Sequence, residues 1–293
     1  MGIWIDTDMG VDDLFAVLML DRTLPIDGMS LVFGCAELAT VRANALDAAV
    51  AYGWTFPVTE GADRALCGTV ETAARILGPS GQPSRGLRLP RAVDRSLTRA
   101  LTGLAAWLER REAAQILALG PLTNLANLAL ARPDLLPRIG RIVWMGGSVG
   151  RGNHTPYAEF NAIADPEALA LLLAREVPMV MVDLEACRKV QVTEPDLAPL
   201  PPILHDLMGG YLDIGLSRGR PGMALYDPVA AALLRAPELF TLSPVELTTE
   251  LADPERRGQT RVAPATGTPW QIVSDLDAEA VRDLCLSALR DPS

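Results

Sequence analysis

The sequence predicts an α/β protein built on a mostly parallel, doubly wound sheet that is flanked by helices. Short apolar runs such as residues 142–145 (IVWM) and 178–182 (PMVMV) do not alternate with polar residues, which is typical of strands covered on both faces. Longer segments of helical periodicity separate these runs, and this order favours right-handed crossovers between parallel strands. Ligands of such sheets bind beyond the carboxyl ends of the strands, so we expect a functional site there.

The individual elements follow from the same patterns. The predicted strands are residues 3–5, 29–34, 116–119, 142–145 and 178–182, and the predicted helices are residues 13–21, 40–52, 122–131, 166–175 and 205–217. Asp165 is expected to cap the helix that begins at Pro166. Residues 77–90 are rich in Gly and Pro and are expected to form a loop. Because no repeat or linker divides the chain, we expect a single domain over residues 1–293.

Composition and charge exclude several classes of protein. The chain has 293 residues, of which 49% are hydrophobic and 21% charged, and this composition argues against disorder. Its net charge of −10 disfavours binding to nucleic-acid polymers, which depends on Lys and Arg neutralising phosphates. The sequence also has no basic run that would bind an anionic membrane surface.

The sequence predicts a cytoplasmic protein. Its first residues lack the basic and apolar regions of a signal peptide, and the longest uncharged stretch, residues 113–131, is interrupted by Gly120 and Pro121 and is not a membrane span. The four cysteines are far apart and form no CxxC motif, so we expect buried free thiols in a reducing compartment.

A cluster of aspartates at the end of the first predicted strand is the strongest functional signal. Residues 6–13 (DTDMGVDD) contain four aspartates immediately before or at the start of a helix. Helix capping, worth roughly 0.3–1 kcal/mol, explains one or two of them. A hard divalent cation explains all four, because Ca²⁺ favours carboxylate ligands. Gly10 is expected to let the backbone turn tightly, so that Asp8 and Asp13 converge.

Other chemistries were weighed for the same cluster. A DxD motif after a first strand also occurs in phosphohydrolases that use the first aspartate, here Asp6, as nucleophile, but Gly10 stands where those enzymes have Thr or Val. An EF-hand loop starting at Asp6 would need Glu at its twelfth position, where Val17 stands. Zinc is disfavoured because the chain has two histidines and neither an HExxH nor a CxxC motif.

A second group of polar residues follows the strand predicted at residues 142–145. Asn153, Glu159 and Asn161 together offer hydrogen-bond donors and acceptors, which suit the vicinal hydroxyls of a sugar. The alternative is a flexible loop that contains helix caps, and this pattern alone leaves both interpretations open.

Together these motifs resemble the inosine–uridine-preferring nucleoside hydrolase family. Residues 6–13 are similar to its DxDxGxDD opening, and residues 120–126 (GPLTNLA) to its GPLTN segment. Its central block is matched in order and spacing by residues 145–147 (MGG), 152–153 (GN), 158–161 (AEFN) and 165–168 (DPEA). The later HDP block is matched by residues 226–230 (YDPVA) except at the first position, and the similarity extends from residue 3 to about residue 235.

The resemblance implies hydrolysis of the N-glycosidic bond of a ribonucleoside, which releases base and ribose, with a tightly bound Ca²⁺. The metal ligands that it implies are Asp8, Asp13, the backbone carbonyl of Thr123 and Asp227. Asp8 would also be the general base for a metal-bound water, and Asp6 would support the site from behind. The family is commonly dimeric or tetrameric, which implies a homodimer or a homotetramer.

The resemblance also implies which residues hold the ribose. Asp12 and Asn161 would bind the 2′ and 3′ hydroxyls, and Asn153 and Glu159 would bind the 5′ and 3′ side of the sugar. These contacts suit a cleavage that passes through an oxocarbenium-like transition state.

The departures from the family lie on or near the base side. Tyr226 stands where the family has a histidine that protonates the leaving purine, and a phenol with a reference pKa of about 10 is a weaker acid than imidazole but still donates a hydrogen bond. Cys35 replaces an asparagine that contacts the sugar, residues 77–81 (LGPSG) replace a His-Gly loop, and residues 187–188 (CR) replace a Thr-His pair.

Several other residues were considered as replacements for the missing histidine. His205 precedes an aspartate, as the family histidine does, but it lies in a predicted helix and no Pro follows. We therefore interpret it as an unrelated histidine. It stays a weak candidate, because the same helix carries base contacts in the family. Tyr211 is a weak candidate from the same helix, and His154 is expected to be a solvated loop residue.

We therefore expect a calcium-dependent ribonucleoside hydrolase with altered base recognition, in which Asp8 and Tyr226 are catalytic. Two alternatives come from other classes. The first is a non-catalytic calcium-dependent protein that binds nucleosides or ribose, and the second is a metal-dependent phosphohydrolase that uses Asp6.

Overall fold

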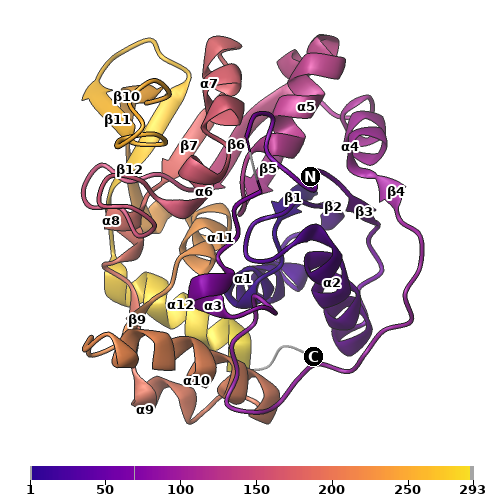
Figure 1. Cartoon of the computed structure of the whole chain (residues 1–293), viewed down its shortest axis with the longest axis vertical. Coiled ribbons are helices and arrows are strands. Elements are labelled where there is room, and N and C mark those ends of the chain that lie inside the picture. The colour runs from indigo at the N-terminus through magenta and orange to yellow at the C-terminus, as the bar shows by residue number, and fades with distance from the viewer. Residues whose placement is uncertain (1, 69, 291–293) are drawn as a thin grey trace.

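A ten-stranded sheet runs through the molecule in the order β11-β10-β12-β7-β6-β5-β1-β2-β3-β4 (Figure 1). The parallel strands are β1 (Ile3–Thr7), β2 (Ile26–Leu31), β3 (Val58–Glu60), β4 (Thr98–Arg99), β5 (Ala114–Ala118), β6 (Ile139–Met145), β7 (Met179–Val182) and β12 (Trp270–Leu276). β10 (Phe240–Thr249) and β11 (Thr260–Pro264) are antiparallel additions at one edge. A separate two-stranded sheet pairs β8 (Gln191–Val192) with β9 (Met223–Ala224). The predicted mostly parallel α/β sheet is confirmed.

This computed structural model describes residues 2–68 and 70–290. The first residue and the last three residues of the predicted domain 1–293 lie outside the described residues, as does Thr69. Within the described ranges, no helix has the length and apolar character that crossing a membrane would require.

Helices cover both faces of the sheet and form two cores with it. The first core contains residues of α1 (Val11–Asp21), α2 (Leu38–Tyr52), α10 (Pro202–Ser217), α11 (Asp227–Arg235) and α12 (Ala278–Arg290). The second core contains residues of α4 (Ala100–Leu108), α5 (Thr123–Ala131) and α7 (Pro166–Ala174). The remaining helices are short: α3 (Ala74–Leu77), α6 (Phe160–Ala164), α8 (Leu184–Cys187), α9 (Glu194–Leu197), and the 3₁₀ helices η1 (Pro133–Arg138) and η2 (Pro237–Leu239).

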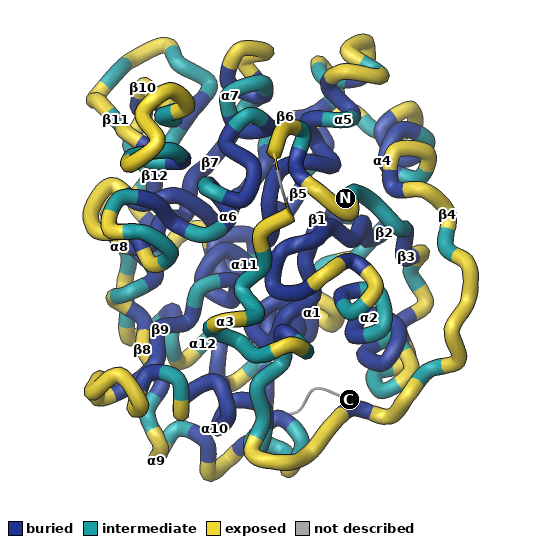
Figure 2. Tube along the Cα trace, in the orientation of Figure 1, coloured by how far each residue is buried: buried dark blue, intermediate teal, exposed yellow. Residues whose placement is uncertain are grey.

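The central strands contain uninterrupted apolar runs because successive side chains enter opposite cores. In β6, Val143 belongs to the first core and Trp144 to the second, and neither is exposed to solvent. Figure 2 shows the central strands as a continuous dark-blue band, with exposed residues concentrated on the outer helices and loops. This burial on both faces is the physical reason for the uninterrupted apolar runs.

The strand order reverses its direction at β1. From β1 the chain proceeds to β2, β3 and β4 on one side, and it then returns to β5, which pairs with the opposite edge of β1. Ile5 consequently pairs with Met29 of β2 and with Leu117 of β5. Such a reversal leaves a crevice at the carboxyl ends of the two central strands, where ligands of open α/β sheets bind.

Most predicted elements are found within a few residues of their expected bounds, but β2 differs. The prediction was a strand over residues 29–34, whereas β2 starts at Ile26 and ends at Leu31. The next residues leave the sheet because the backbone N–H of Phe33 donates to the carbonyl of Ala62, in a different segment. Asp165 caps α7 as predicted, accepting a hydrogen bond from the N–H of Ala168.

One expectation about the cysteines is only partly confirmed. All four are free, and three of them are buried, but Cys67 is exposed.

We expect Leu117→Ala to lower the free energy of unfolding by about 2–5 kcal/mol, because the truncation leaves a cavity at the centre of the sheet where Leu117 is fully buried. Leu130→Ala is the matched control, since Leu130 is 55% exposed on α5. Urea unfolding of both variants measures the difference. Equal losses in the two would contradict the assignment of Leu117 to the core.

Candidate active site

A cavity of about 850 Å³, which includes its open mouth, lies at the carboxyl edge of the central strands. Seven of the ten residues predicted for the site line this cavity: Asp8, Asp12, Asn153, Glu159, Asn161, Tyr226 and Asp227. The two polar groups recognised separately in the sequence are therefore parts of one site.

The turn between β1 and α1 has an unusual backbone, but not where the sequence suggested. Gly10 was expected to supply the tight turn, yet its φ is −81°, which any residue adopts. Gly10 is needed for a different reason, because a Cβ at this position would lie 2.5 Å from the Cys35 sulfur. Met9 carries the positive φ, of +27°, which is rare for a residue with a side chain. Its carbonyl accepts a hydrogen bond from Asn44, which helps to hold this strained turn.

Backbone and hydroxyl donors fix the first two candidate ligands. Asp13 accepts hydrogen bonds from the Thr7 hydroxyl and from the backbone N–H of Gly10, the latter at 2.8 Å. Asp8 accepts one from the backbone N–H of Cys35. A Cβ at Gly34 would lie 2.0 Å from the nearer Asp8 oxygen, so only glycine permits this approach of β1 to the chain beyond β2.

Two further aspartates converge on Asp13. Ligand atoms of Asp12, Asp13 and Asp227 all lie within 4.8 Å of one another, and those of Asp8, Asp13 and Cys35 satisfy the same limit. Asp227 reaches the site because it is the first residue of α11, which packs against α1. Tyr211, a weak candidate from the sequence, lines the cavity and donates a hydrogen bond of 3.1 Å to Asp12.

This arrangement keeps the carboxyl groups protonated unless a cation is present. Burial raises the pKa of Asp8 and Asp227 well above its usual range, and the charges of neighbouring aspartates raise it further. Burial, reinforced by the charge of Asp13, raises the pKa of Asp12 to about 7. A bound divalent cation removes this penalty by pairing with the charged forms. The donors are mainly carboxylate oxygens, as Ca²⁺ prefers, and the residues therefore fit a metal site.

The predicted sugar-binding residues are held by the loop after β6 and by α6. Glu159 caps α6, accepting hydrogen bonds from the N–H groups of Gly147 and Asn161 at 2.8 Å each. The Asn161 amide group donates to the carbonyls of Leu119 and Met145, so its side-chain oxygen remains the acceptor for a ligand. Burial raises the pKa of Glu159 to about 7. The two interpretations of this segment, helix capping and sugar binding, therefore do not exclude each other.

Asn153 differs from Asn161 in which end of its side-chain amide remains free. Its side-chain oxygen accepts a hydrogen bond of 2.9 Å from the N–H of Phe160, so its amide group remains the donor. Asn153 and Asn161 therefore present a donor and an acceptor to the same cavity.

Asp6 and Thr123 do not line the cavity. Asp6 is fully buried and accepts hydrogen bonds from Ser30 and Asn124, while its second oxygen has no partner in the described part of the chain. A nucleophile must reach its substrate, so this position argues against the phosphohydrolase alternative. The Thr123 hydroxyl donates to Asp165 at 2.6 Å at the start of α5.

The sequence misjudged the surroundings of two residues that line the cavity. His154 was expected to be a solvated loop residue, but its side chain is only 13% exposed, lines the cavity and lies 2.6 Å from the Glu71 carboxylate. Cys35 was noted only as a lost contact, yet its thiol lies 3.8 Å from Asp13. His205 lies on α10 and is not among the residues that line the cavity.

Other residues that line the cavity, among them Ile76, Phe160, Arg218 and Arg220, were not predicted for the site. Ile76 and Phe160 contribute apolar surface, and Arg220 contributes a cation from the turn before β9. Nothing in their local sequence signals a ligand, because only the fold brings them to this edge. The order of segments in the resemblance was the one available signal for Phe160, which lies between two predicted site residues.

Comparison with known proteins agrees with this geometry. A sequence model described as inosine-uridine preferring nucleoside hydrolase matches residues 3–283. The non-specific ribonucleoside hydrolase RihC of Shigella boydii is 34% identical over 83% of this chain and 82% of that protein, and RihC of Escherichia coli is 32% identical over 95% of each. A solved plant nucleoside hydrolase, PpNRh1, superposes with a TM-score of 0.91 and 26% identity over 99% of both chains. A purine-preferring ribonucleoside hydrolase from Gardnerella vaginalis shares the fold at a TM-score of 0.90, with 22% identity over 99% of this chain and 98% of its own.

The fold and the cavity define an α/β enzyme with a site for a small ligand, and the chain belongs to the inosine–uridine-preferring nucleoside hydrolase family. It is accordingly an N-glycosidase.

Chelation of divalent cations is expected to lower the melting temperature more at pH 8 than at pH 5. Burial raises the pKa of Asp6 and Asp12 from the ordinary 3.8 to about 7 in the folded protein. Between these values the folded chain binds protons that the unfolded chain has released, so the free energy of unfolding falls as the pH rises. A bound cation offsets this loss, and its effect grows with deprotonation.

Scanning calorimetry with excess EGTA and with excess CaCl₂ at both pH values measures the effect. MgCl₂ is the control for charge alone, because Mg²⁺ fits a flexible set of buried carboxylates less well than Ca²⁺ does. A calcium-dependent shift of equal size at pH 5 and pH 8 would contradict this account of the cluster.

Proposed function

We propose that this chain is a calcium-dependent ribonucleoside hydrolase in which Asp8 is the general base. The observation that carries the proposal is the convergence of the buried aspartates Asp8, Asp12, Asp13 and Asp227 on one cavity that also contains an Asn/Glu/Asn set. The names of the related ribonucleoside hydrolases support the same substrate class.

The proposed calcium ligands are Asp8, Asp13, Asp227 and the backbone carbonyl of Thr123. When bound, the cation supplies a positive charge that orients a water molecule and favours its deprotonation. The three carboxylates come from segments that the fold packs together: the turn before α1, the first turn of α1 and the start of α11. Thr123 is 1% exposed at the start of α5, directly after the loop that follows β5.

The ribose is proposed to lie on the carboxylate floor of the cavity. Asp12 and Asn161 would bind its 2′ and 3′ hydroxyls, and Asn153 and Glu159 the 5′ and 3′ side. Their own hydrogen bonds to backbone groups and to Tyr211 orient these side chains before a substrate arrives. Such preorganisation lowers the entropic cost of reaching the transition state.

Asp8 is proposed to accept the proton of the attacking water. Its carboxylate lines the cavity and is held in one orientation by the backbone N–H of Cys35. As the glycosidic bond breaks, positive charge develops on the sugar, and the fixed carboxylates around it stabilise that charge.

Tyr226 is proposed to donate a hydrogen bond or a proton to the departing base. Its ring is half-buried at the cavity wall, next to Asp227. Burial raises the pKa of Tyr226, so the hydroxyl stays protonated throughout the neutral range. A protonated phenol can therefore serve where the family has a histidine, with less acidity.

The experiment that tests the proposal is incubation of the protein with a panel of ribonucleosides and CaCl₂, followed by measurement of reducing sugar. We expect ribose and free base in equal amounts, and no product with EGTA. Nucleoside-dependent thermal stabilisation without any product would instead support the non-catalytic binding alternative.

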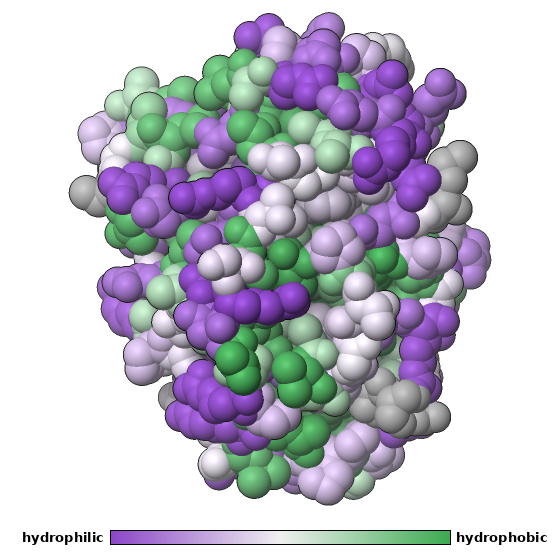
Figure 3. Space-filling view, turned by 90° about the vertical axis from the view of Figure 1, so that its right-hand side faces the viewer, coloured by the Kyte–Doolittle hydropathy of each residue, from purple (hydrophilic) through white to green (hydrophobic). Residues whose placement is uncertain are grey.

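We further propose a single domain that acts in the cytoplasm as a homodimer or homotetramer. Four free cysteines are compatible with a reducing compartment. On the face in Figure 3, hydrophobic side chains form several groups separated by hydrophilic ones. Leu101 and Leu130 are exposed beside a second, open cavity, and sedimentation analysis would test whether such surfaces mediate assembly.

Asp8→Asn is expected to reduce kcat by about 10²–10⁴-fold, because the amide cannot accept the proton of the attacking water. Asp283→Asn, on the exposed side of α12, is the control for the loss of one carboxylate. Steady-state kinetics at saturating CaCl₂ give both values. Retention of near-normal turnover by the Asp8 variant would eliminate it as the base.

Tyr226→Phe is expected to lower kcat by about tenfold or more while the protein remains folded, since the change removes one hydroxyl that donates to the leaving base. Tyr52→Phe is the matched control, because the Tyr52 hydroxyl is buried, has no hydrogen-bond partner in the described part of the chain and does not line the cavity. The effect should be larger for substrates whose base is a poor leaving group. Equal kcat values in the two variants would show that the Tyr226 hydroxyl is not the donor.

A further inference from the structure

Three arginines line the outer part of a cavity whose floor is acidic. Arg188 follows α8, and Arg218 and Arg220 lie in the turn between α10 and β9. The aspartates of the floor come instead from the turn before α1, from the first turn of α1 and from the start of α11. The cavity therefore has a negatively charged floor and a positively charged rim.

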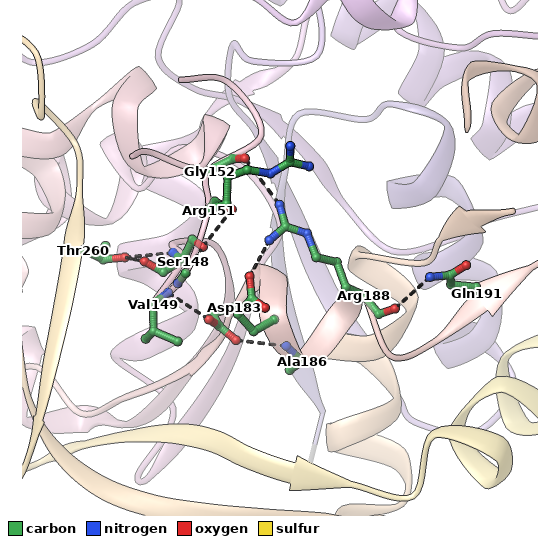
Figure 4. Close-up of polar contacts among 11 residues, drawn as sticks. Ser148, Val149, Arg151, Gly152, Asp183, Ala186, Arg188, Gln191 and Thr260 are labelled. Carbon is green, nitrogen blue, oxygen red and sulfur yellow. Dashed lines mark hydrogen bonds and ion pairs between the residues drawn. The ribbon is translucent and has the colours of Figure 1, made fainter. Parts of the chain in front are cut away.

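Arg188 is fixed in place by the chain itself. One terminal nitrogen pairs with the Glu185 carboxylate, and the other donates to the carbonyl of Gly152 at 3.3 Å (Figure 4). The loop that carries Gly152 is itself anchored, because the N–H of Val149 donates to Asp183 at 3.0 Å. Arg188 is thus a positioned cation with one carboxylate partner.

Arg218 and Arg220 differ from Arg188 in having no internal partner. Within residues 2–68 and 70–290, neither guanidinium forms a hydrogen bond or an ion pair with another side chain or with the backbone. Both residues are exposed, and both line the cavity. Each guanidinium offers five donors in a planar arrangement that matches a carboxylate.

The position of these cations relative to Tyr226 indicates which part of a ligand they would meet. Arg188 follows Cys187, whose thiol donates to the backbone carbonyl of Tyr226 at 3.7 Å, and both Arg188 and Arg220 line the cavity together with Tyr226. In the proposed function Tyr226 donates to the leaving base. Arg220 and Arg188 therefore lie on the side of the cavity where that proposal places the base.

A neutral base would leave Arg218 and Arg220 without a counter-charge. We propose that the preferred substrate is a ribonucleoside whose base carries an oxyanion, such as a carboxylate, which Arg220 and Arg218 bind and which Arg188 supports. This inference rests on the proposed function, since it uses Tyr226 to locate the base. It assigns the replacement of the family's Thr-His pair by residues 187–188 (CR) to a change of substrate charge.

The test is a series of uridines that differ in charge on the base: the C5- and C6-carboxylates, uridine itself, and 5-aminomethyluridine, which is a cation at neutral pH. Uridine 5′-monophosphate carries its oxyanion on the sugar instead. We expect kcat/KM for at least one carboxylate to exceed that for uridine by about tenfold at low ionic strength, mainly through KM, and the aminomethyl compound to be the poorest substrate. The preference should shrink as KCl is added, since salt screens exposed charges.

The double variant Arg218→Gln/Arg220→Gln should lose most of this preference, by about tenfold in the ratio of the carboxylate to uridine. Arg110→Gln is the control, because Arg110 is exposed and does not line the cavity. Three results would overturn the inference: no carboxylate preferred over uridine, an equal fall for both substrates in the double variant, or a preference for the 5′-monophosphate alone.

Binding of the same compounds by calorimetry separates this inference from the proposed function. If no nucleoside is cleaved but a carboxyuridine binds about tenfold more tightly than uridine in the wild type and not in the double variant, the hydrolase proposal fails and oxyanion recognition stands. If uridine is cleaved and no carboxylate is preferred in binding or in turnover, the hydrolase proposal stands and oxyanion recognition fails.

Discussion

The mutual repulsion of buried carboxylates is the constraint on which the rest of the site depends. Asp8, Asp12, Asp13 and Asp227 approach one another to within a few ångströms, and water is largely absent to screen them. Such a cluster is tolerated only when hydrogen-bond donors and a cation offset the charge. The Thr7 hydroxyl and the Gly10 amide supply the donors for one of these groups, and the glycine at position 34 supplies the space for another. The strained turn at Met9 persists because these contacts hold it.

The residues at the opposite end of the cavity differ in charge from its acidic floor. A phenol has replaced an imidazole at Tyr226, and arginines stand at the rim where a neutral ligand would need none. Apart from Cys35, the residues proposed to bind the ribose match the family motifs, and those around the proposed place of the base do not. A hydrolase can change its substrate without changing its reaction when the residues around the sugar keep their chemistry and those around the base differ. The bond that breaks joins the sugar to the base.

The sequence predicted the sheet well because strands buried on both faces must be apolar throughout, as Ile142 to Met145 are. It also located Asp8, Asp12, Asn161 and Asp227, whose motifs are local. It failed where an answer depends on segments that meet only in the folded chain. The sequence indicated a conformational role for Gly10, but the contact that requires glycine is with Cys35, in the loop after β2. The sequence predicts a solvated His154, since its partner Glu71 is distant in sequence. Likewise, nothing in the sequence near Arg220 indicates that its turn reaches the same cavity.

The strand order also determines when the site can exist during synthesis. Asp8 emerges from the ribosome near the start of translation, but its proposed co-ligand Asp227 is more than 200 residues away, and β5 must be inserted beside β1 before the crevice is formed. Until then the aspartates of the first turn remain hydrated, and a cation has no closed set of ligands to bind. Ion capture therefore marks completion of the fold, and a chain truncated before α11 would lack the means to retain the metal.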